Sequence, residues 1–225
     1  MSKKKTALRW MVPLVILTGL LFGAQFAQAS PVLYPTGVDD SFVALNGGSQ
    51  DTHYTMTGNG NVILNGAPAV AISNSTIWWQ WVKPTDARWI YNADLEDSGI
   101  RGTYDFQTTF NLTGYNPATA SISGKWAADQ YGSIFLNGIA TGISLVDGNW
   151  DGNNYPDLHS FTISSGFLPG INTLTFRVDL PDGGDGLLVR DTSVTANAVP
   201  VPPALLLFGS GLIGLAGLGR RFRKS

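Results

Sequence analysis

The stretch TYDFQTTFNL, residues 103–112, alternates large and polar side chains with a period of two. Successive side chains of an extended strand point to opposite faces of a sheet. One face of a strand here carries these side chains: Tyr104, Phe106, Thr108, Phe110 and Leu112. The pattern therefore predicts a β-strand of an antiparallel sheet with one face on the core and one face toward solvent.

Downstream, further runs alternate in the same way or are rich in β-branched and aromatic residues: 119–126, 133–136, 158–163, 173–180 and 187–195. Turn-forming sequences separate them, among them Asn116-Pro117, Asn137-Gly138, Asp147-Gly148, 168–170 and 181–184. Many short strands divided by such turns indicate an all-β fold, an antiparallel β-sandwich or jelly roll. No convincing helical period occurs between residues 30 and 198.

The segment before these strands is less regular and holds four tryptophans within twelve residues: Trp78, Trp79, Trp81 and Trp89. On a strand, Trp79 and Trp81 would share a face and Trp78 would lie opposite. Two interpretations stay open, namely that these rings fill one end of the core or that they line a binding face.

The chain contains no cysteine, which excludes disulfides, cysteine nucleophiles and thiolate zinc sites. Residues 30–198 are long enough for one domain with its own core. They hold six basic residues against all 16 acidic ones, a formal net charge of −10. Such a surface repels phosphate backbones, so we expect no nucleic-acid partner.

Both ends of the chain read as targeting segments. Lys3, Lys4, Lys5 and Arg9 precede an apolar run that ends at Ala27-Gln28-Ala29, the pattern of a secretory signal peptide over residues 1–29. An uncleaved anchor is the alternative. At the other end, residues 204–219 carry no charge and are followed by a basic cluster. We expect a short transmembrane helix there, with the C-terminus in the cytoplasm.

The tail, residues 199–225, resembles the PEP-CTERM sorting signal of Gram-negative bacteria. The positions that carry the resemblance are Val199, Pro200, Pro202, Gly209, Gly211, Gly214, Arg220 and Arg221. The glutamate of the name-giving Pro-Glu-Pro is replaced by Val201. The resemblance implies recognition and cleavage by exosortase, a membrane protease-transpeptidase of species that make extracellular polysaccharide. A simple anchor that is never cut is the other interpretation.

A second resemblance covers residues 110–178, which are similar to galactose-binding-like β-sandwich modules. It rests on Trp126 with Asp129, on a strand ending in Asn137-Gly138, and on a spaced series: Phe161, Ile163, Gly166, Gly170, Asn172, Leu174 and Phe176. These motifs mostly define fold. They imply a sandwich of a kind that often binds sugars, without requiring that this one does.

One acidic loop offers two kinds of site. Asp147, Asn149 and Asp151 alternate before Gly152, as at the start of a calcium loop, and Asp157 could supply a further ligand. A polar loop rich in turn formers is the alternative. Trp150 lies between Asn149 and Asp151, so these three residues form a candidate sugar platform, with the ring for stacking and the polar groups for hydroxyls.

No motif selects a catalytic group. The Gly-x-Ser-x-Gly elbow is missing, no carboxylate pair stands out, and we expect His53 in a packing role and His159 on an outward strand face. We therefore expect a non-enzymatic protein, exported through the inner membrane to the cell envelope, outer surface or extracellular matrix. Its expected partners are exosortase and an exopolysaccharide, in a matrix or biofilm. A glycan hydrolase, or a permanently anchored protein with a non-sugar ligand, is the alternative.

Overall fold

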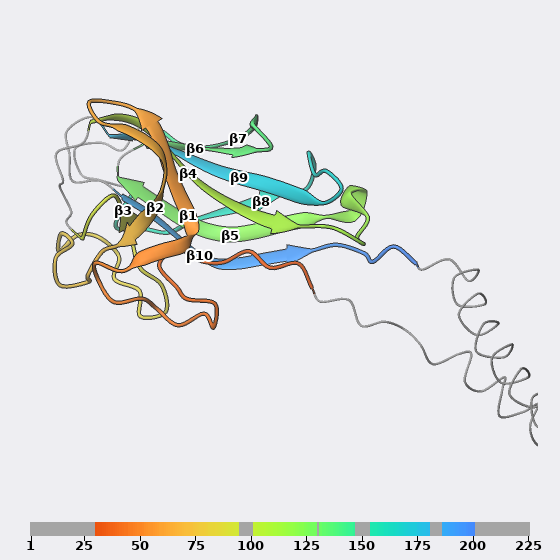
Figure 1. The fold of residues 1–225 in the computed structure, drawn as a ribbon, viewed down its shortest axis with the longest axis horizontal. Coiled ribbons are helices and arrows are strands. Elements are labelled where there is room, and N and C mark those ends of the chain that lie inside the picture. Colours follow the sequence, from red (N-terminus) through yellow and green to blue (C-terminus); the bar gives the residue numbers. More distant parts are fainter. Residues whose placement is uncertain (1–29, 95–100, 130, 147–153, 181–185, 201–225) are drawn as a thin grey trace, which may run out of the picture. The chain divides into compact units, whose positions relative to one another are not determined.

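Ten strands form one antiparallel sheet in the part of the chain that the computed structural model describes, which is residues 30–94, 101–129, 131–146, 154–180 and 186–200. Their order across the sheet is β7-β6-β9-β4-β1-β2-β3-β10-β5-β8 (Figure 1). The strands are β1 (Gln50–Asn59), β2 (Ile63–Ala71), β3 (Ile90–Tyr91), β4 (Gly102–Asn111), β5 (Ser121–Asp129), β6 (Tyr131–Leu136), β7 (Ile139–Leu145), β8 (His159–Ile163), β9 (Ile171–Leu180) and β10 (Gly186–Thr195). Ser30–Ala198 forms one unit.

Strand β4 confirms the alternation in residues 103–112. Its even-numbered side chains from Tyr104 to Phe110 are buried, and Leu112 just beyond the strand is buried as well. The intervening residues are exposed or half-buried. Each of the ten residues of β4 has a ladder partner on β9, from Gly102 opposite Leu180 to Asn111 opposite Ile171, and the other edge of β4 pairs with β1. The predicted all-β antiparallel fold is therefore confirmed.

The sheet folds back so that its two halves face each other across an aromatic core. Phe176 of β9 lies 5.6 Å from Trp126 of β5 and 5.9 Å from Phe161 of β8, ring centre to ring centre. In the sheet order, β9 is far from β5 and β8, so these contacts cross between layers. Figure 1 shows the two layers, with β6, β9 and β4 on one side and β5, β10 and β8 on the other. Burial of each such ring stabilises the fold by about 1.5–3 kcal/mol. The chain has no cysteine, so this core stabilises the fold without disulfides.

Part of the galactose-binding-like motif, around Asn137 and Asn172, holds the loops at one end of this sandwich. Asn137 and Gly138 both have positive φ, 52° and 79°, as a two-residue hairpin turn between β6 and β7 requires. Asn172 is fully buried, and its amide bonds the backbone of Leu168 and Gly170 and the side chain of Asn137. These residues hold loops in place and leave no polar group there for a ligand.

Three parts of the fold differ from the expectations or go beyond them. Strands β1, β2, β3 and β7 were not predicted, and β1 has register irregularities between Asp51 and Thr55 and between Met56 and Thr57. Such bulges bend a strand and break its alternation. His159 is half-buried on the side of β8 that carries Phe161 and Ile163, so its predicted outward position is wrong.

The predicted signal peptide and tail helix lie outside the described residues, except that Val199 and Pro200 are described and exposed. Within the described ranges, no helix has the length and apolar character needed to cross a membrane. The sorting-signal positions from Pro202 to Arg221 therefore stay predictions.

Candidate functional site

The tryptophan-rich segment forms a turn and not a strand. The Trp81 amide donates to the Trp78 carbonyl at 3.1 Å, which closes a four-residue turn between β2 and β3. The expected sharing of a face by Trp79 and Trp81 is therefore wrong. Trp81 is 2% exposed, whereas Trp78 is 49% exposed and Trp79 is 82% exposed. Residues 78–81 are called the tryptophan turn below.

The core holds this turn through its one buried ring. Trp81 lies 4.2 Å from Trp89 and 6.3 Å from Tyr155, ring centre to ring centre. The Trp89 indole N–H donates to the Val82 carbonyl at 2.8 Å, and the Val82 amide donates to the Tyr155 carbonyl at 3.0 Å. The two outer indoles are thus displayed from a fixed base. Both interpretations of the tryptophans hold in part, since Trp81 and Trp89 are core and Trp78 and Trp79 face outward.

Asp129, the last residue of β5, is a buried carboxyl beside this turn. Burial raises its pKa from the ordinary value of 3.8 to about 7, and the nearby Trp81 indole lowers it by less. Neither the Trp81 Nε1 atom nor the Asp129 Oδ1 atom makes a hydrogen bond of normal geometry within the described residues. At neutral pH this carboxyl is therefore divided between its neutral and charged forms.

The sequence-predicted sugar and calcium loop lies largely outside the described residues, because Asp147, Asn149, Trp150 and Asp151 fall in 147–153. Asp157 is described and exposed. The first residues after 153 are tied to the tryptophan turn and to β5, since the Asn154 carbonyl accepts from Ala128 at 3.1 Å and Tyr155 bonds Val82. Across the described ranges, no three His, Cys, Asp or Glu side chains are grouped as a metal site.

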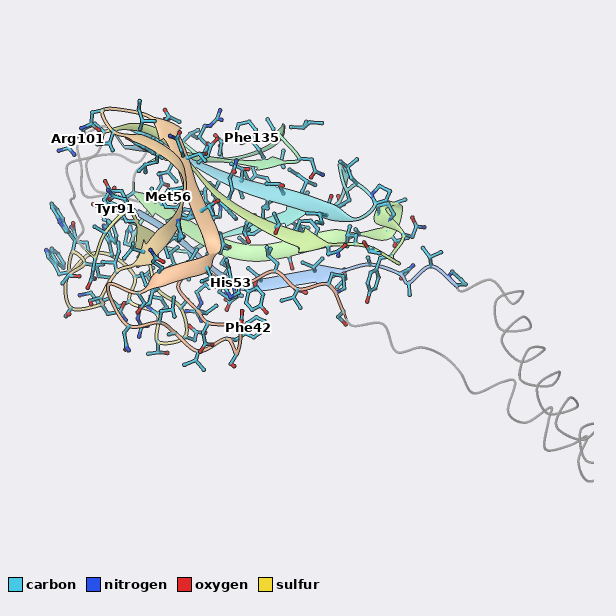
Figure 2. The ribbon with its side chains drawn as sticks, viewed as in Figure 1. Phe42, His53, Met56, Tyr91, Arg101 and Phe135 are labelled. Atoms are coloured by element: carbon cyan, nitrogen blue, oxygen red, sulfur yellow. The ribbon has the colours of Figure 1, made fainter. Side chains whose placement is uncertain are left out.

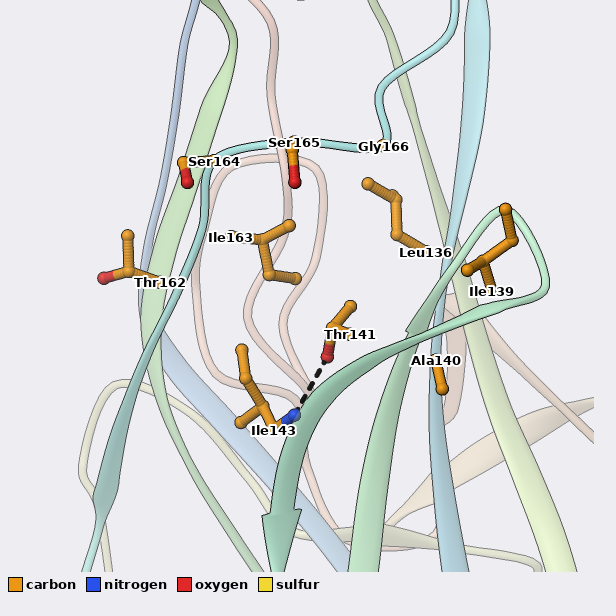
Figure 3. Close-up of a pocket in the computed structure, with 10 residues that line it drawn as sticks. All are labelled: Leu136, Ile139, Ala140, Thr141, Ile143, Thr162, Ile163, Ser164, Ser165 and Gly166. Carbon is orange, nitrogen blue, oxygen red and sulfur yellow. Dashed lines mark hydrogen bonds between the residues drawn. The ribbon is translucent and has the colours of Figure 1, made fainter.

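A second feature is a hollow of about 240 Å³ between the two edge strands β7 and β8 (Figure 3). Ile139, Ile143 and Ile163 give it apolar walls, and Ser164 and Ser165 lie at its rim. The Thr141 hydroxyl on its wall is already bonded to the Ile134 carbonyl and to the Ile143 amide. The lining holds no charged and no aromatic side chain, so it offers neither acid–base groups nor a stacking platform.

Sequence reasoning did not single out Trp79 as a platform and preferred Trp150. The missed signal is the adjacent pair Trp78-Trp79 followed by Gln80 and, soon after, by Lys83 and Pro84. Two neighbouring indoles cannot both enter one core from a turn. Only the tertiary structure shows that Trp81 enters the core and that Trp78 and Trp79 stay outside.

Comparisons with known proteins place few constraints on the chain. No family model matches it, and no curated protein matches it. Among solved structures, it is similar to a CBM35 from Paenibacillus barcinonensis at 13% identity and a TM-score of 0.38, covering 66% of this chain and 96% of that one. It is also similar to a family 35 carbohydrate-binding module from an environmental isolate, at 9% identity and a TM-score of 0.37. That match covers 67% of this chain and 97% of the module.

A third solved structure, the GH31 alpha-xylosidase from Xanthomonas citri, matches at 17% identity and a TM-score of 0.29. The match covers 64% of this chain and 15% of the xylosidase. With TM-scores below 0.5, these similarities assign neither a family nor an activity to the chain. The functional conclusion therefore has to come from its own residues.

Proposed function

We propose that this chain is an exported, non-enzymatic carbohydrate-binding protein of the cell envelope or extracellular matrix, and that the tryptophan turn contacts the glycan. The observation that carries the proposal is Trp79, which leaves 82% of its surface exposed while Trp81 anchors the same turn in the core. Exposing an indole forgoes about 2 kcal/mol of burial. An outward indole on an anchored turn is suited to stacking on the C–H face of a sugar ring.

Charge supports a neutral glycan as the ligand. The segment 30–198 carries a formal net charge of −10, which disfavours acidic polysaccharides. Gln80 of the same turn is half-buried and carries an amide that can meet sugar hydroxyls; its side-chain oxygen accepts from the Tyr155 hydroxyl at 3.5 Å. The proposal includes a galactose-binding-like jelly roll as the specific form of the sandwich, on the motif residues between 110 and 178.

The proposed route to the envelope rests on the sequence of the two ends. It comprises export by the signal peptide, transit through the inner membrane, and processing of the 199–225 tail by exosortase in a Gram-negative bacterium. The acidic loop with Asp147, Asn149, Asp151 and Asp157 stays a predicted calcium site, and Trp150 stays a predicted second ring for the same glycan.

Affinity gel electrophoresis tests the glycan proposal. The purified full chain is run through native gels that contain galactomannan, mixed-linkage β-glucan or the acidic polymer polygalacturonate. We expect retardation in at least one neutral gel and none in polygalacturonate. Trp79→Ala should weaken retention about fivefold to tenfold, because it removes one stacking contact.

The matched control is Ile63→Ala, which removes another exposed apolar side chain at a distance in sequence from the turn. It should leave retention unchanged. Equal mobility in all gels, or equal retention of wild type and Trp79→Ala, would contradict the proposal. Release of reducing ends from either neutral polymer would favour the hydrolase alternative instead.

A further inference from the structure

A second aromatic group lies outside the tryptophan turn and combines two rings of the segment before β1 with one ring of β1 (Figure 2). The rings of Tyr34 and His53 are parallel, with centres 3.6 Å apart and an interplanar angle of 2°. The Phe42 ring stacks on Tyr34 at 4.8 Å and 22°. Phe42 is 49% exposed, so this three-ring stack ends at the surface in an open phenyl ring.

The backbone is strained at Phe42, the residue that carries the exposed ring. Phe42 has φ of 62°, in the left-handed region that bulky residues avoid. It occupies a tight turn in which its amide donates to the Asp39 carbonyl and the Asp39 amide donates to the Val43 carbonyl, both at 2.9 Å. The Asp39 carboxylate accepts from the Ser41 and Val43 amides, which fixes the turn. Glycine or asparagine is the ordinary residue at such a position.

Polar groups border the stack. Asp40 is 89% exposed, and its Oδ1 atom lies 3.4 Å from His53 Nε2. The base of the stack is rigid, because the buried Asp51 carboxylate accepts from the Gly37 amide at 2.7 Å and from the His53 amide at 2.9 Å. The Tyr54 hydroxyl donates to the Tyr34 carbonyl at 2.9 Å. The turn thus carries an exposed phenyl ring and, two residues before it in the chain, an exposed carboxylate, on a preformed support.

We propose that the Phe42 ring and Asp40 form a second glycan-contact site, which makes the protein bivalent and able to join two glycan chains. The inference rests on the proposed glycan binding for its ligand class and goes beyond it in site and consequence. A neutral pyranose fits both elements, since its C–H face stacks on a ring and its hydroxyls donate to a carboxylate. A uronate would meet repulsion from Asp40 and from the net charge of the domain.

Two measurements separate this site from the tryptophan turn. A protein with one glycan site is enough for retention in the galactomannan and β-glucan gels. Agglutination of beads that carry these two polymers needs two sites on each protein molecule. The variant Phe42→Asn removes the ring and keeps a residue that tolerates positive φ, so the turn should still form. Val43→Ala, the neighbouring exposed side chain, is the control.

We expect the purified full chain to agglutinate the beads. Phe42→Asn and Trp79→Ala should each abolish agglutination while retaining gel retardation about fivefold to tenfold weaker than wild type. The double variant should show no retardation. Asp40→Asn should weaken agglutination with neutral beads, and Val43→Ala should behave as wild type.

Agglutination by Phe42→Asn equal to wild type would overturn the second site and leave the first intact. If the wild type were not retarded in any of the gels, the proposed function itself would be overturned. Light scattering after size exclusion tests whether agglutination comes from self-association of the protein. A wild-type dimer that becomes a monomer in Phe42→Asn would show that the stack is a self-association surface, which contradicts the inference.

Discussion

Single residues in this protein carry costs that the packing around them has to offset. Asp129 is buried without a hydrogen bond to its Oδ1 atom among the described residues, and Phe42 holds a positive φ. Buried, unpaired carboxyls and strained bulky residues each cost of the order of 1–3 kcal/mol. Asp129 lies beside the buried Trp81 ring of the tryptophan turn, and Phe42 is itself an exposed ring. Strain and poor polar satisfaction therefore coincide here with the candidate binding surfaces.

Asp129 predicts a pH dependence of stability. The folded state keeps its proton up to about pH 7, whereas the unfolded state releases it near the ordinary pKa of 3.8. Between these values the folded state binds more protons, so this contribution to stability falls as the pH rises from about 4 to 7 and is constant above. The loss is of the order of 4 kcal/mol.

Thermal unfolding of wild type and Asp129→Asn between pH 4 and pH 8 checks this. The variant should match wild type near pH 4 and be more stable at pH 8, since a neutral amide cannot ionise. Asp157→Asn, at an exposed carboxylate, should leave the difference between the two pH values unchanged. Parallel pH curves for wild type and Asp129→Asn would show that the Asp129 environment is not desolvated.

At the scale of elements, loops are held by a few buried polar side chains and not by regular ladders. Asn172 at the start of β9 organises the loop between β8 and β9 and the turn between β6 and β7. The tryptophan turn is held by one ring and by the bond between Val82 and Tyr155. Losing such a contact therefore displaces a whole loop.

Asn172→Ala should lower the free energy of unfolding by about 2–4 kcal/mol, because it leaves the Leu168 amide and two carbonyls without their partner. Urea unfolding measures this difference. Thr109→Ala, at an exposed position of β4, should change the free energy by less than about 0.5 kcal/mol. A loss below 1 kcal/mol for Asn172→Ala would mean that water replaces the amide.

At the scale of the whole molecule, the charges are divided unequally between the folded segment and the two ends proposed as targeting signals. All 16 acidic residues lie between the two end segments, and eight of the 14 basic ones lie within those segments. Removal of both ends would therefore release an acidic domain from two basic, apolar flanks. The acidic domain would then be repelled by anionic membrane surfaces.

Mass spectrometry of the protein recovered from a Gram-negative host that has exosortase tests this. The expected chain begins at Ser30 and ends within residues 199–203. The same gene in a host without exosortase should give Ser30 at the start and an uncut tail. An intact Ser225 end in the first host would overturn the sorting proposal and favour the permanent anchor.

The sequence by itself predicted the fold class and most strands after residue 102. In strands with one buried face, such as β4 and β9, apolar and polar residues alternate along the sequence, so the strands can be predicted from it. The β1–β3 region escaped prediction because bulges after Asp51 and Met56 break the period. Composition alone also established that the chain forms no disulfide and that residues 30–198 carry a negative net charge.

Only the tertiary structure decided which aromatic residues are available to a ligand. Trp78, Trp79 and Trp81 are equivalent in sequence, and contact with Trp89 makes Trp81 a core residue. Tyr34, Phe42 and His53 are spread over twenty residues and form one stack only in the folded chain. Periodicity is a local property of the chain, whereas exposure depends on neighbours that are distant in sequence, so the first can be read from the residues and the second cannot.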